Sequence, residues 1–428
     1  MRLSVAVAAL IALSSGCGRM PDKSEIKYDS YHSIALDGAI DNGVIITSSS
    51  YDSTIRDQIL TQLRYSVGFL NGYQSVGDIS KTLTKSIVIK NKEQLPSGDW
   101  KVIYSAAMVV SWARGNSTPS ELELILPEST DYNHGMPQKF YDKYAAPECL
   151  ASDAHDLGLF NFWYYIRPEQ RRCALGRGNS PAELSIRFPI HLKVSAINTT
   201  GKSPEYTKIW EDGRLVVTAA FSTNVPGSGP TDIGVREYGS FFSHMVSNYG
   251  QPTRGAENIP VGGPGLDQPI VHLEFQSNRG PVEVHMFLVD GLSGNGSSFD
   301  REFGAATLTS DLILYNGHAN LGGNVHALAR KIQIKKGQYH LIMLNNCDTF
   351  AYIDDEFAQR HKAANPDAPD YKFVDIISNS MPSPFSYNAE SATTVVRAAT
   401  SASQTYRQIL SGFNHYQHPS VIGEEDNG

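Results

Sequence analysis

Two short apolar runs, each followed by a residue capable of chemistry, decide the fold of this chain. Residues Leu312–Asn320 are LILYNGHAN, and residues His340–Thr349 are HLIMLNNCDT. Runs this short and this apolar are typical of strands that are buried on both faces of a parallel sheet. Between them, apolar residues recur at helical spacing from Leu321 to Ile332. The stretch therefore predicts a strand, a helix and a second strand parallel to the first.

His318 and Cys347 come directly after the two predicted strands. Because parallel strands end at the same edge of a sheet, we expect both residues at the edge where open α/β sheets bind ligands. A cysteine nucleophile needs a lowered pKa and a nearby base. We expect a helix that begins at Asp348 or Thr349 to lower the pKa of Cys347, with His318 as the base. The alternative for Cys347 is a small buried apolar side chain, as free cysteines often are.

Length, composition and net charge limit the number of domains and the class of protein. The 428 residues are too many for one ordinary core, so two domains are expected. The hydrophobic share of 41% is that of a soluble globular protein. The net charge of −8 argues against a nucleic-acid partner, because nucleic-acid binders carry a basic excess or patch. We expect no cofactor.

The N-terminus has the pattern of a targeting segment. Arg2 precedes the apolar run Leu3–Leu13, which is too short to span a bilayer and is typical of a signal-peptide core. The small residues before Cys17 resemble a bacterial lipobox, although Leu13 lies one place further from the cysteine than in the usual pattern. We therefore expect residues 1–17 to be a lipoprotein-type signal peptide. The protein would be exported to the bacterial cell envelope and held on a membrane by a lipid on Cys17. The alternative is simple secretion.

The cysteines agree with export. The chain has four, and Cys149 and Cys173 remain to pair with each other if Cys17 is lipidated. Such a disulfide would close a loop of about two dozen residues and contribute roughly 3 kcal/mol. Cys347 is then a leftover thiol, which in an exported protein suggests reactivity.

The chain divides by composition into a β-rich first part and an α/β second part. Residues 21–224 contain β-branched or alternating runs between turn residues and predict a β-rich N-terminal domain. Residues 225–268 are rich in Gly, Pro and Asn and predict a linker. Residues 269–415 predict an α/β domain with a mainly parallel sheet, and residues 416–428 a polar tail. The aromatic stretch Phe160–Pro168 predicts a core strand beside the cysteine pair.

A predicted hairpin offers a possible metal site. His272 and Glu274 share one face of a strand, and His285 lies on the partner strand, an arrangement from which zinc sites can be built. The spacing matches no recognised motif, and alternating polar residues on an edge hairpin usually face solvent. We therefore expect no metal here, and a zinc hydrolase is the third and weakest functional hypothesis.

The two motifs resemble those of the caspase-like (clan CD) cysteine peptidases, which include caspases, metacaspases, legumains, clostripain and gingipains. These share an apolar strand that ends in His-Gly and a later apolar strand that ends in a small residue and Cys. Leu312–His318 and Leu341–Cys347 stand in those places, and Tyr315–His318 is most similar to gingipains. The resemblance covers roughly Pro269 to Phe413. It implies a caspase-like fold, a peptide or protein substrate, Cys347 as nucleophile and His318 as general base or acid.

Residues beside the pair are further site candidates. Gly317 and Ala319 flank the histidine, and Ala319 replaces a family glycine whose backbone N–H helps to bind the oxyanion. Asn346 stands where Ala, Gly or Ser precedes the cysteine in the family. Asn316 and Asn345 are candidates to orient the histidine or the substrate.

A third strand end, at Ser378 and Asn379, is expected at the same sheet edge and could shape a substrate pocket. The leading hypothesis is thus an exported cysteine peptidase that uses a Cys/His dyad. The alternative is a non-catalytic envelope lipoprotein that keeps the caspase-like fold for binding or a structural role.

Overall fold

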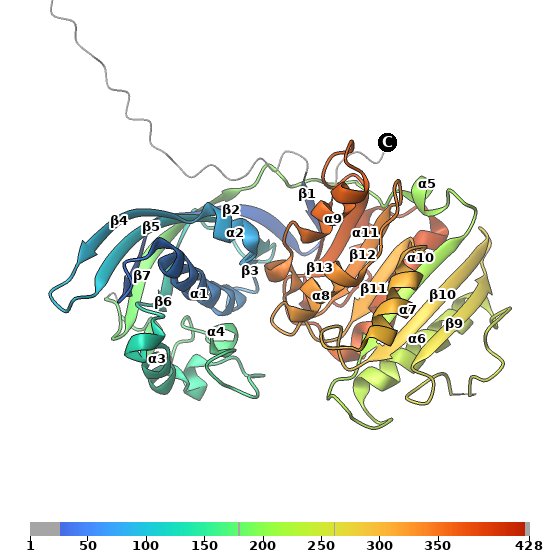
Figure 1. Ribbon diagram of the computed structural model, residues 1–428, viewed down its shortest axis with the longest axis horizontal. Helices are drawn as coiled ribbons and strands as arrows, with labels where there is room; N and C mark the ends of the chain where they lie inside the picture. The colour runs from blue at the N-terminus through green and yellow to red at the C-terminus, as the bar shows by residue number, and fades with distance from the viewer. Residues whose placement is uncertain (1–25, 179, 261, 424–428) are drawn as a thin grey trace, which may run out of the picture.

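The computed structural model describes residues 26–178, 180–260 and 262–423, which form two units, each built around one sheet (Figure 1). The expected signal peptide and Cys17 lie outside these residues. In the same ranges, no helix is long and apolar enough to cross a membrane. The described fold is mixed α/β, with one antiparallel sheet and one largely parallel sheet.

The first unit is an antiparallel sheet in the order β3-β5-β2-β7-β6, with β4 paired to β5. Its long central strand β2 has a β-bulge between Ile40 and Gly43. Helix α1 packs on this unit through Ile55, Ile59 and Leu63, which recur on one face and are fully buried. The strands are β2 (Ser33–Thr47), β3 (Val76–Gly77), β4 (Val88–Gln94), β5 (Trp100–Ala113), β6 (Glu121–Pro127) and β7 (Ser185–Val194), and the helices are α1 (Asp52–Asn71), α2 (Lys81–Ser86), α3 (Met136–Tyr144) and α4 (Phe162–Tyr165).

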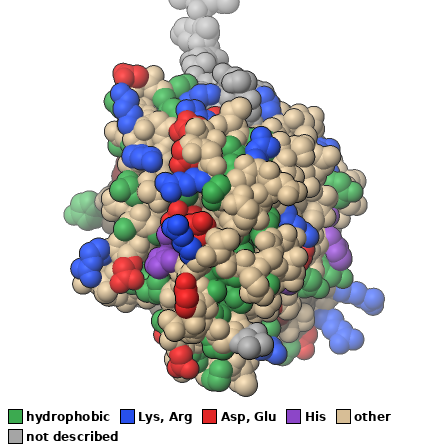
Figure 2. Space-filling model, turned by 90° about the vertical axis from the view of Figure 1, so that its right-hand side faces the viewer, with side chains coloured by type: hydrophobic (Ala, Val, Ile, Leu, Met, Phe, Trp, Pro, Cys, Tyr) green, Lys and Arg blue, Asp and Glu red, His purple; other side chains and the backbone are tan. Residues whose placement is uncertain are grey.

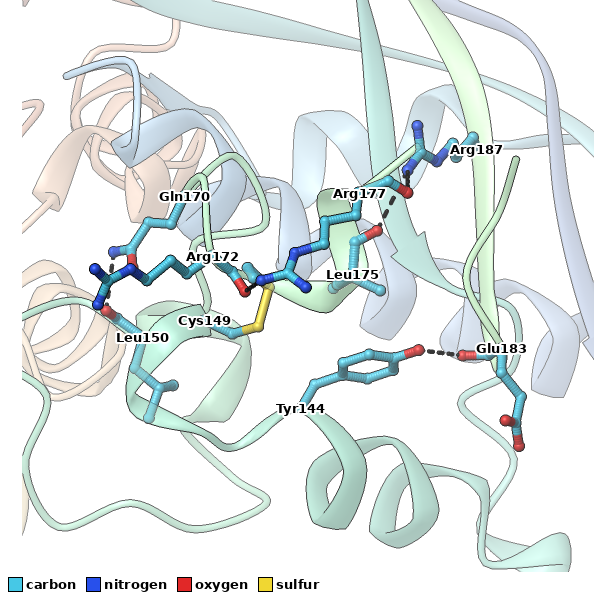
Figure 3. The surroundings of a disulfide bond; sticks show 10 residues. Tyr144, Cys149, Leu150, Gln170, Arg172, Leu175, Arg177, Glu183 and Arg187 are labelled. Atoms are coloured by element: carbon cyan, nitrogen blue, oxygen red, sulfur yellow. Dashed lines mark hydrogen bonds between the residues drawn. A yellow bond between two sulfur atoms is a disulfide. The ribbon is translucent and has the colours of Figure 1, made fainter. Parts of the chain in front are cut away.

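The expected disulfide between Cys149 and Cys173 is present, with a Cα–Cα distance of 4.6 Å (Figure 3). The aromatic stretch beside it is not a strand, as the sequence suggested, but the short helix α4. All four of its side chains are buried, with Phe162 in edge-to-face contact with Tyr65 and Phe140. A strand would have alternated these rings between two faces, whereas here one turn of helix places Phe162 among rings of α1 and α3.

The second unit is an eight-stranded sheet in the described residues, in the order β1-β14-β13-β12-β11-β8-β10-β9. The five strands from β13 to β10 are parallel, and the outer pairings are antiparallel. The strands are β1 (Lys27–Ser30), β8 (Leu215–Ser222), β9 (Ile270–Gln276), β10 (Pro281–Val289), β11 (Leu312–Asn316), β12 (His340–Asn345), β13 (Val374–Asn379) and β14 (Pro419–Gly423). The helices are α5 (Tyr206–Ile209), α6 (Ile233–Tyr249), α7 (Ser297–Thr307), α8 (Gly323–Lys331), α9 (Glu356–Ala364), α10 (Asn388–Ser401) and α11 (Tyr406–Leu410).

The predicted unit of strand, helix and parallel strand is confirmed as β11, α8 and β12. Side chains alternate along each strand between two cores. Leu312 and Leu314 pack with α6, α10 and α11, whereas Ile313 and Tyr315 pack with α7, α8 and α9. Helices therefore cover both faces, which explains why these strands are continuously apolar.

The predicted domain boundaries do not coincide with the two sheets. Strand β8 was expected in residues 21–224 of the first domain but is a central strand of the second sheet. The predicted linker, residues 225–268, contains helix α6. The predicted tail, residues 416–428, contains β14, which lies between β13 and β1 with Val421 buried. Composition missed the two strand assignments because a strand's partners are set by long-range pairing.

The two units are packed together through a shared core. One apolar cluster runs from residues of the first sheet, such as Val110, to residues of α8 and α9 in the second unit. Backbone and side-chain hydrogen bonds also cross the boundary: Ile79 N–H donates to the Ala351 carbonyl at 3.0 Å, and the hydroxyls of Ser111 and Ser380 are 2.6 Å apart. The first unit therefore packs against the segment that directly follows Cys347.

Candidate active site

The structure places His318 and Cys347 at the same edge of the parallel sheet. Strands β11 and β12 are direct neighbours, and their last residues, Asn316 and Asn345, are paired in register. His318 follows its strand end by two residues and Cys347 does the same, so the two residues leave the sheet at equivalent positions. Both are half-buried.

The His318 ring is held from two sides. Its Nε2 lies 2.8 Å from the backbone carbonyl of Asn224, in the loop after β8. A carbonyl can only accept, so Nε2 carries the proton in the neutral ring and Nδ1 keeps its lone pair. The ring also packs against Phe385, with centroids 4.8 Å apart. The contribution of Asn224 was not visible in the sequence, because it is a backbone contact from a distant loop.

The Cys347 thiol does not have the lowered pKa that the sequence suggested. Burial raises its pKa to about 12, and the negative charge of Asp348 adds to the rise. Contacts with the Ser383 carbonyl, 4.0 Å from Sγ, and with Tyr164 offset this only in part. In the described conformation the thiol is therefore protonated at neutral pH.

The chain after Cys347 differs from the expected helix. Asp348 adopts a left-handed backbone conformation with φ of 50°, and residues Thr349–Tyr352 form one turn of 3-10 helix. Helix α9 begins only at Glu356. Asp348 does not cap the turn, because its carboxylate is bonded elsewhere. The described segment after Cys347 therefore does not place an α-helix N-terminus at the thiol to stabilise a thiolate.

Asp348 instead binds the first unit. Its buried carboxylate accepts from Asn71 Nδ2 at 3.0 Å and from the hydroxyl of Tyr164. Arg167 in turn donates to the Asn71 side chain at 3.2 Å. Burial is the main reason that the pKa of Asp348 rises to about 6. Tyr164 thus connects helix α4 of the first unit to the residue next to Cys347.

One loop contacts both chemically active residues. Ser383 approaches Cys347 through its carbonyl, and Phe385, two residues later, packs on His318. This loop leads from β13 to α10 and was not identified in the sequence as part of the site. The two side chains therefore meet a common structural element at the sheet edge.

Asn316 and Asn345 are buried below this edge, and their side chains do not bond to His318. Asn345 Nδ2 donates to Asn316 Oδ1 at 3.1 Å and to Asn388 Oδ1 at 3.0 Å. Asn345 Oδ1 accepts from Asn379, Ser383 and Gln417. We call the residues Asn316, Asn345, Asn379, Asn388 and Gln417 the amide cluster. It ties together β11, β12, β13, α10 and the segment before β14.

Asn346, next to the amide cluster, has no hydrogen-bond partner for either side-chain polar atom, although it is fully buried. Leaving buried amide groups unpaired costs about 1–3 kcal/mol each. Asn346, which directly precedes Cys347, therefore lowers the stability of the folded protein. Unsatisfied buried groups of this kind are often associated with function.

The backbone at Gly317 requires glycine. Its φ is 155°, and a Cβ there would lie 1.8 Å from the Ser222 hydroxyl oxygen. Gly317 N–H points at the Asn345 carbonyl at 3.4 Å, and His318 N–H donates to Ser222 at 3.3 Å. Ala319 is buried. The oxyanion role of Gly317 and Ala319 stays a prediction.

The proposed pocket residues Ser378 and Asn379 are buried inside the sheet edge. The hydroxyl of Ser378 lies 3.2 Å from that of Ser420, and Asn379 belongs to the amide cluster. Ser420 lies on β14, which the sequence had assigned to the tail, whereas the Asn379 side chain donates to Asn345 Oδ1 and to the Asn346 carbonyl. Both side chains therefore form part of the buried interior of the sheet edge, and their role in a substrate pocket stays a prediction.

A cavity of about 170 Å³ lies between the two units and is not lined by His318 or Cys347. Asp78 and Val109 line it from the first unit, and Ile353, Asp355 and Tyr371 from the second. Lys85 forms an ion pair with Asp355 at 2.5 Å across it. The cavity is thus a feature of the packing between units.

The hairpin histidines lie side by side. His272 and His285 are register partners on β9 and β10, with their Nδ1 atoms 2.5 Å apart. The second ring nitrogen of His285 lies 3.1 Å from Glu283, and Glu274 does not join them in a three-ligand group in the described residues. At this end of the molecule, acidic, basic and histidine side chains are interspersed on the surface (Figure 2).

Comparisons with known proteins give no family for the chain. No family model and no curated protein matches it.

Proposed function

We propose that this protein is a cysteine peptidase with a caspase-like second unit, in which Cys347 is the nucleophile and His318 the general base. The observation that carries the proposal is the placement of both residues two positions beyond the ends of adjacent parallel strands, against one loop. A nucleophile and a base at one sheet edge, with the base oriented by a third group, is the arrangement that covalent catalysis requires.

The His318 contact to Asn224 supports the role of base. Because Nε2–H is engaged with a carbonyl, the free lone pair on Nδ1 can take the thiol proton of Cys347. The thiolate would attack the carbonyl carbon of the scissile bond, and the C–N bond would break. His318 would pass its proton to the leaving amine, and water would then hydrolyse the acyl-enzyme.

Because the pKa of Cys347 is raised, the proposed peptidase must change conformation before it can act. Burial and the charge of Asp348 favour the protonated thiol, so the described conformation corresponds to a resting enzyme. Turnover would require the segment that carries Tyr164 to move away from Cys347 and admit a peptide. Water would then reach the thiol, and its pKa would fall toward its ordinary value.

The second candidate is a binding or structural protein that keeps the fold without turnover. The same raised pKa of Cys347 favours it, as does the buried, unpaired Asn346 that replaces a small residue. In this case Cys347 would be an inert, half-buried thiol at the contact between the two units.

The location is part of the proposal. We propose export through residues 1–17 and attachment to an envelope membrane through Cys17, which would place any peptide or protein substrate at the cell surface or in the periplasm. Cys17→Ser is expected to move the protein from the membrane fraction to the soluble fraction. An unchanged membrane fraction would argue against the lipid anchor.

Labelling with a thiol-reactive peptide probe separates the two candidates. The native protein should be labelled at Cys347, and His318→Ala should reduce the rate of labelling by at least about 100-fold, the lower range for losing a general base. His134→Ala, a change of an exposed histidine in the first unit, serves as the matched control. Cys347→Ala should abolish hydrolysis of a fluorogenic peptide library.

Two results would contradict the peptidase. One is labelling of Cys347 that occurs only after denaturation, and the other is labelling at the same rate in His318→Ala and in the wild type. Either result would favour the binding protein.

A further inference from the structure

A second group of chemically active side chains lies outside the candidate active site. His326 Nδ1 is 3.7 Å from Asp354 Oδ2 and 3.8 Å from Glu356 Oε2. All three atoms lie within 4.8 Å of one another. Asp354 is buried, whereas His326 and Glu356 are half-buried, so the group is open to solvent on one side.

The fold brings these residues together from two segments. His326 lies on α8, which follows the His318 loop. Asp354 and Glu356 lie where the chain enters α9, after Cys347. Asp354 is oriented by the backbone, because its Oδ1 accepts from the Glu356 N–H at 2.9 Å. That bond directs Oδ2 toward His326, as an outer partner orients a metal ligand.

The two separations from His326 are closer to those between ligands around an ion than to those of a hydrogen-bonded pair. A direct bond from an imidazole to a carboxylate would bring the two atoms to about 2.7–2.9 Å, whereas both contacts here are nearly 1 Å longer. Metal bonds of about 2.0–2.2 Å at angles between tetrahedral and trigonal place neighbouring ligand atoms about 3.3–3.8 Å apart. The three atoms therefore surround a point that an ion can occupy after small side-chain movements.

We propose that His326, Asp354 and Glu356 bind a divalent first-row transition metal ion, for which Zn²⁺ is the probe. One imidazole with two carboxylates suits such ions, whereas Ca²⁺ and Mg²⁺ prefer oxygen ligands alone. Three protein ligands leave room for a water molecule or a further ligand. Arg330, whose guanidinium is 3.9 Å from Glu356, lies on the outer side of the group.

The consequence of metal binding would be structural. The ion would join the segment after His318 to the segment after Cys347, which already touch where Gly322 packs on the Tyr352 ring. It would thereby fix the relative position of the two loops at the sheet edge. The proposal does not depend on peptidase activity, because the three ligands do not include His318 or Cys347.

The test is a Zn²⁺ titration of chelator-treated, tag-free protein against a competing chromophoric chelator. We expect one equivalent to bind, and His326→Ala and Glu356→Gln each to weaken binding by at least about 10-fold. His272→Ala is the matched control, because the His272–His285 pair is another histidine group that could take the metal. Zn²⁺ should also raise the Tm of the wild type by more than it raises that of Glu356→Gln at the same Zn²⁺ concentration.

Unchanged affinity in His326→Ala would overturn the proposal, as would loss of binding in His272→Ala alone. Circular dichroism of each variant establishes that it is folded. If one variant is unfolded, the other still decides the question. Failure to bind Zn²⁺ would leave the peptidase proposal untouched, since that proposal is tested by labelling of Cys347.

Discussion

Two neighbouring asparagines have opposite hydrogen-bonding environments. Asn345 donates to Asn316 and Asn388 and accepts from three further side chains, whereas both polar atoms of Asn346 are unpaired. The sequence alone shows two identical residues before Cys347. Their difference arises because successive residues leave the strand in different directions, and only one meets the amide cluster.

Replacing each asparagine with alanine should therefore have unequal effects on stability. Asn345→Ala should lower the free energy of unfolding by about 3 kcal/mol or more, because its partners stay buried without bonds. Asn346→Ala should change it by less than about 1 kcal/mol, since removal of the unpaired groups offsets the lost packing. Urea denaturation of both variants measures this, and equal losses would contradict the assignment.

Asp348 should make stability depend on pH. Burial raises its pKa from 3.8 to about 6 in the folded protein, so the protonated acid is favoured by folding. Its contribution is complete below about pH 4 and is lost as the pH rises through about 6. The free energy of unfolding of the wild type should therefore fall relative to that of Asp348→Asn by about 2–2.5 kcal/mol between pH 4 and pH 7.

Urea unfolding of both proteins at intervals of one pH unit tests this. A difference that stays constant with pH would show that Asp348 is not held in the buried, protonation-favouring environment.

At the scale of elements, the local sequence pattern was sufficient to predict a helix or strand where the segment is long or strongly apolar. The β11-α8-β12 unit and the hairpin of β9 and β10 were both predicted. Short segments that depend on distant partners were not, as with α4, the turn after Cys347, and β14. A helix is recognised in a sequence by apolar residues about 3.6 positions apart, and a half-buried strand by apolar residues two positions apart. A four-residue segment that is aromatic at every position shows neither of these periods.

The disulfide is an element-scale constraint that can be tested directly. The double variant Cys149→Ser and Cys173→Ser should lose about 3 kcal/mol of unfolding free energy, because the unfolded chain regains the freedom of a loop with a sequence separation of 24. Thermal unfolding of the oxidised wild type, the double variant and Cys347→Ser compares the three. A double variant as stable as the wild type would contradict this, and Cys347→Ser is the control for loss of a free thiol.

At the scale of the whole molecule, the sequence predicted two parts but did not predict that they share one hydrophobic core. The shared core joins the first sheet to α8 and α9, and Asp348 is bonded to the first unit through Asn71 and Tyr164. For the candidate site, the sequence supplied His318 and Cys347. It did not supply Asn224, the Ser383–Phe385 loop or Tyr164, because tertiary contacts of single polar or aromatic residues leave no periodic signal.

Residues 200–423 expressed alone should therefore be unstable, although they contain most of the larger sheet. The fragment lacks β1 and would expose both the β14 edge and the part of the core that the first unit covers. We expect insoluble protein, or a soluble form that binds the dye ANS strongly. A monomeric, cooperatively unfolding fragment would show that the second unit is an independent domain.

The pairing of β1 with β14 has a consequence for biosynthesis. Lys27–Ser30 pairs with Ser420–Gly423, so the earliest described strand finds its partner almost 400 residues later. During translation this strand emerges long before β14 exists, and the larger sheet cannot be completed until the chain is nearly finished. A protein exported through a narrow channel before it folds avoids this conflict, since every strand is then released before the sheet must close.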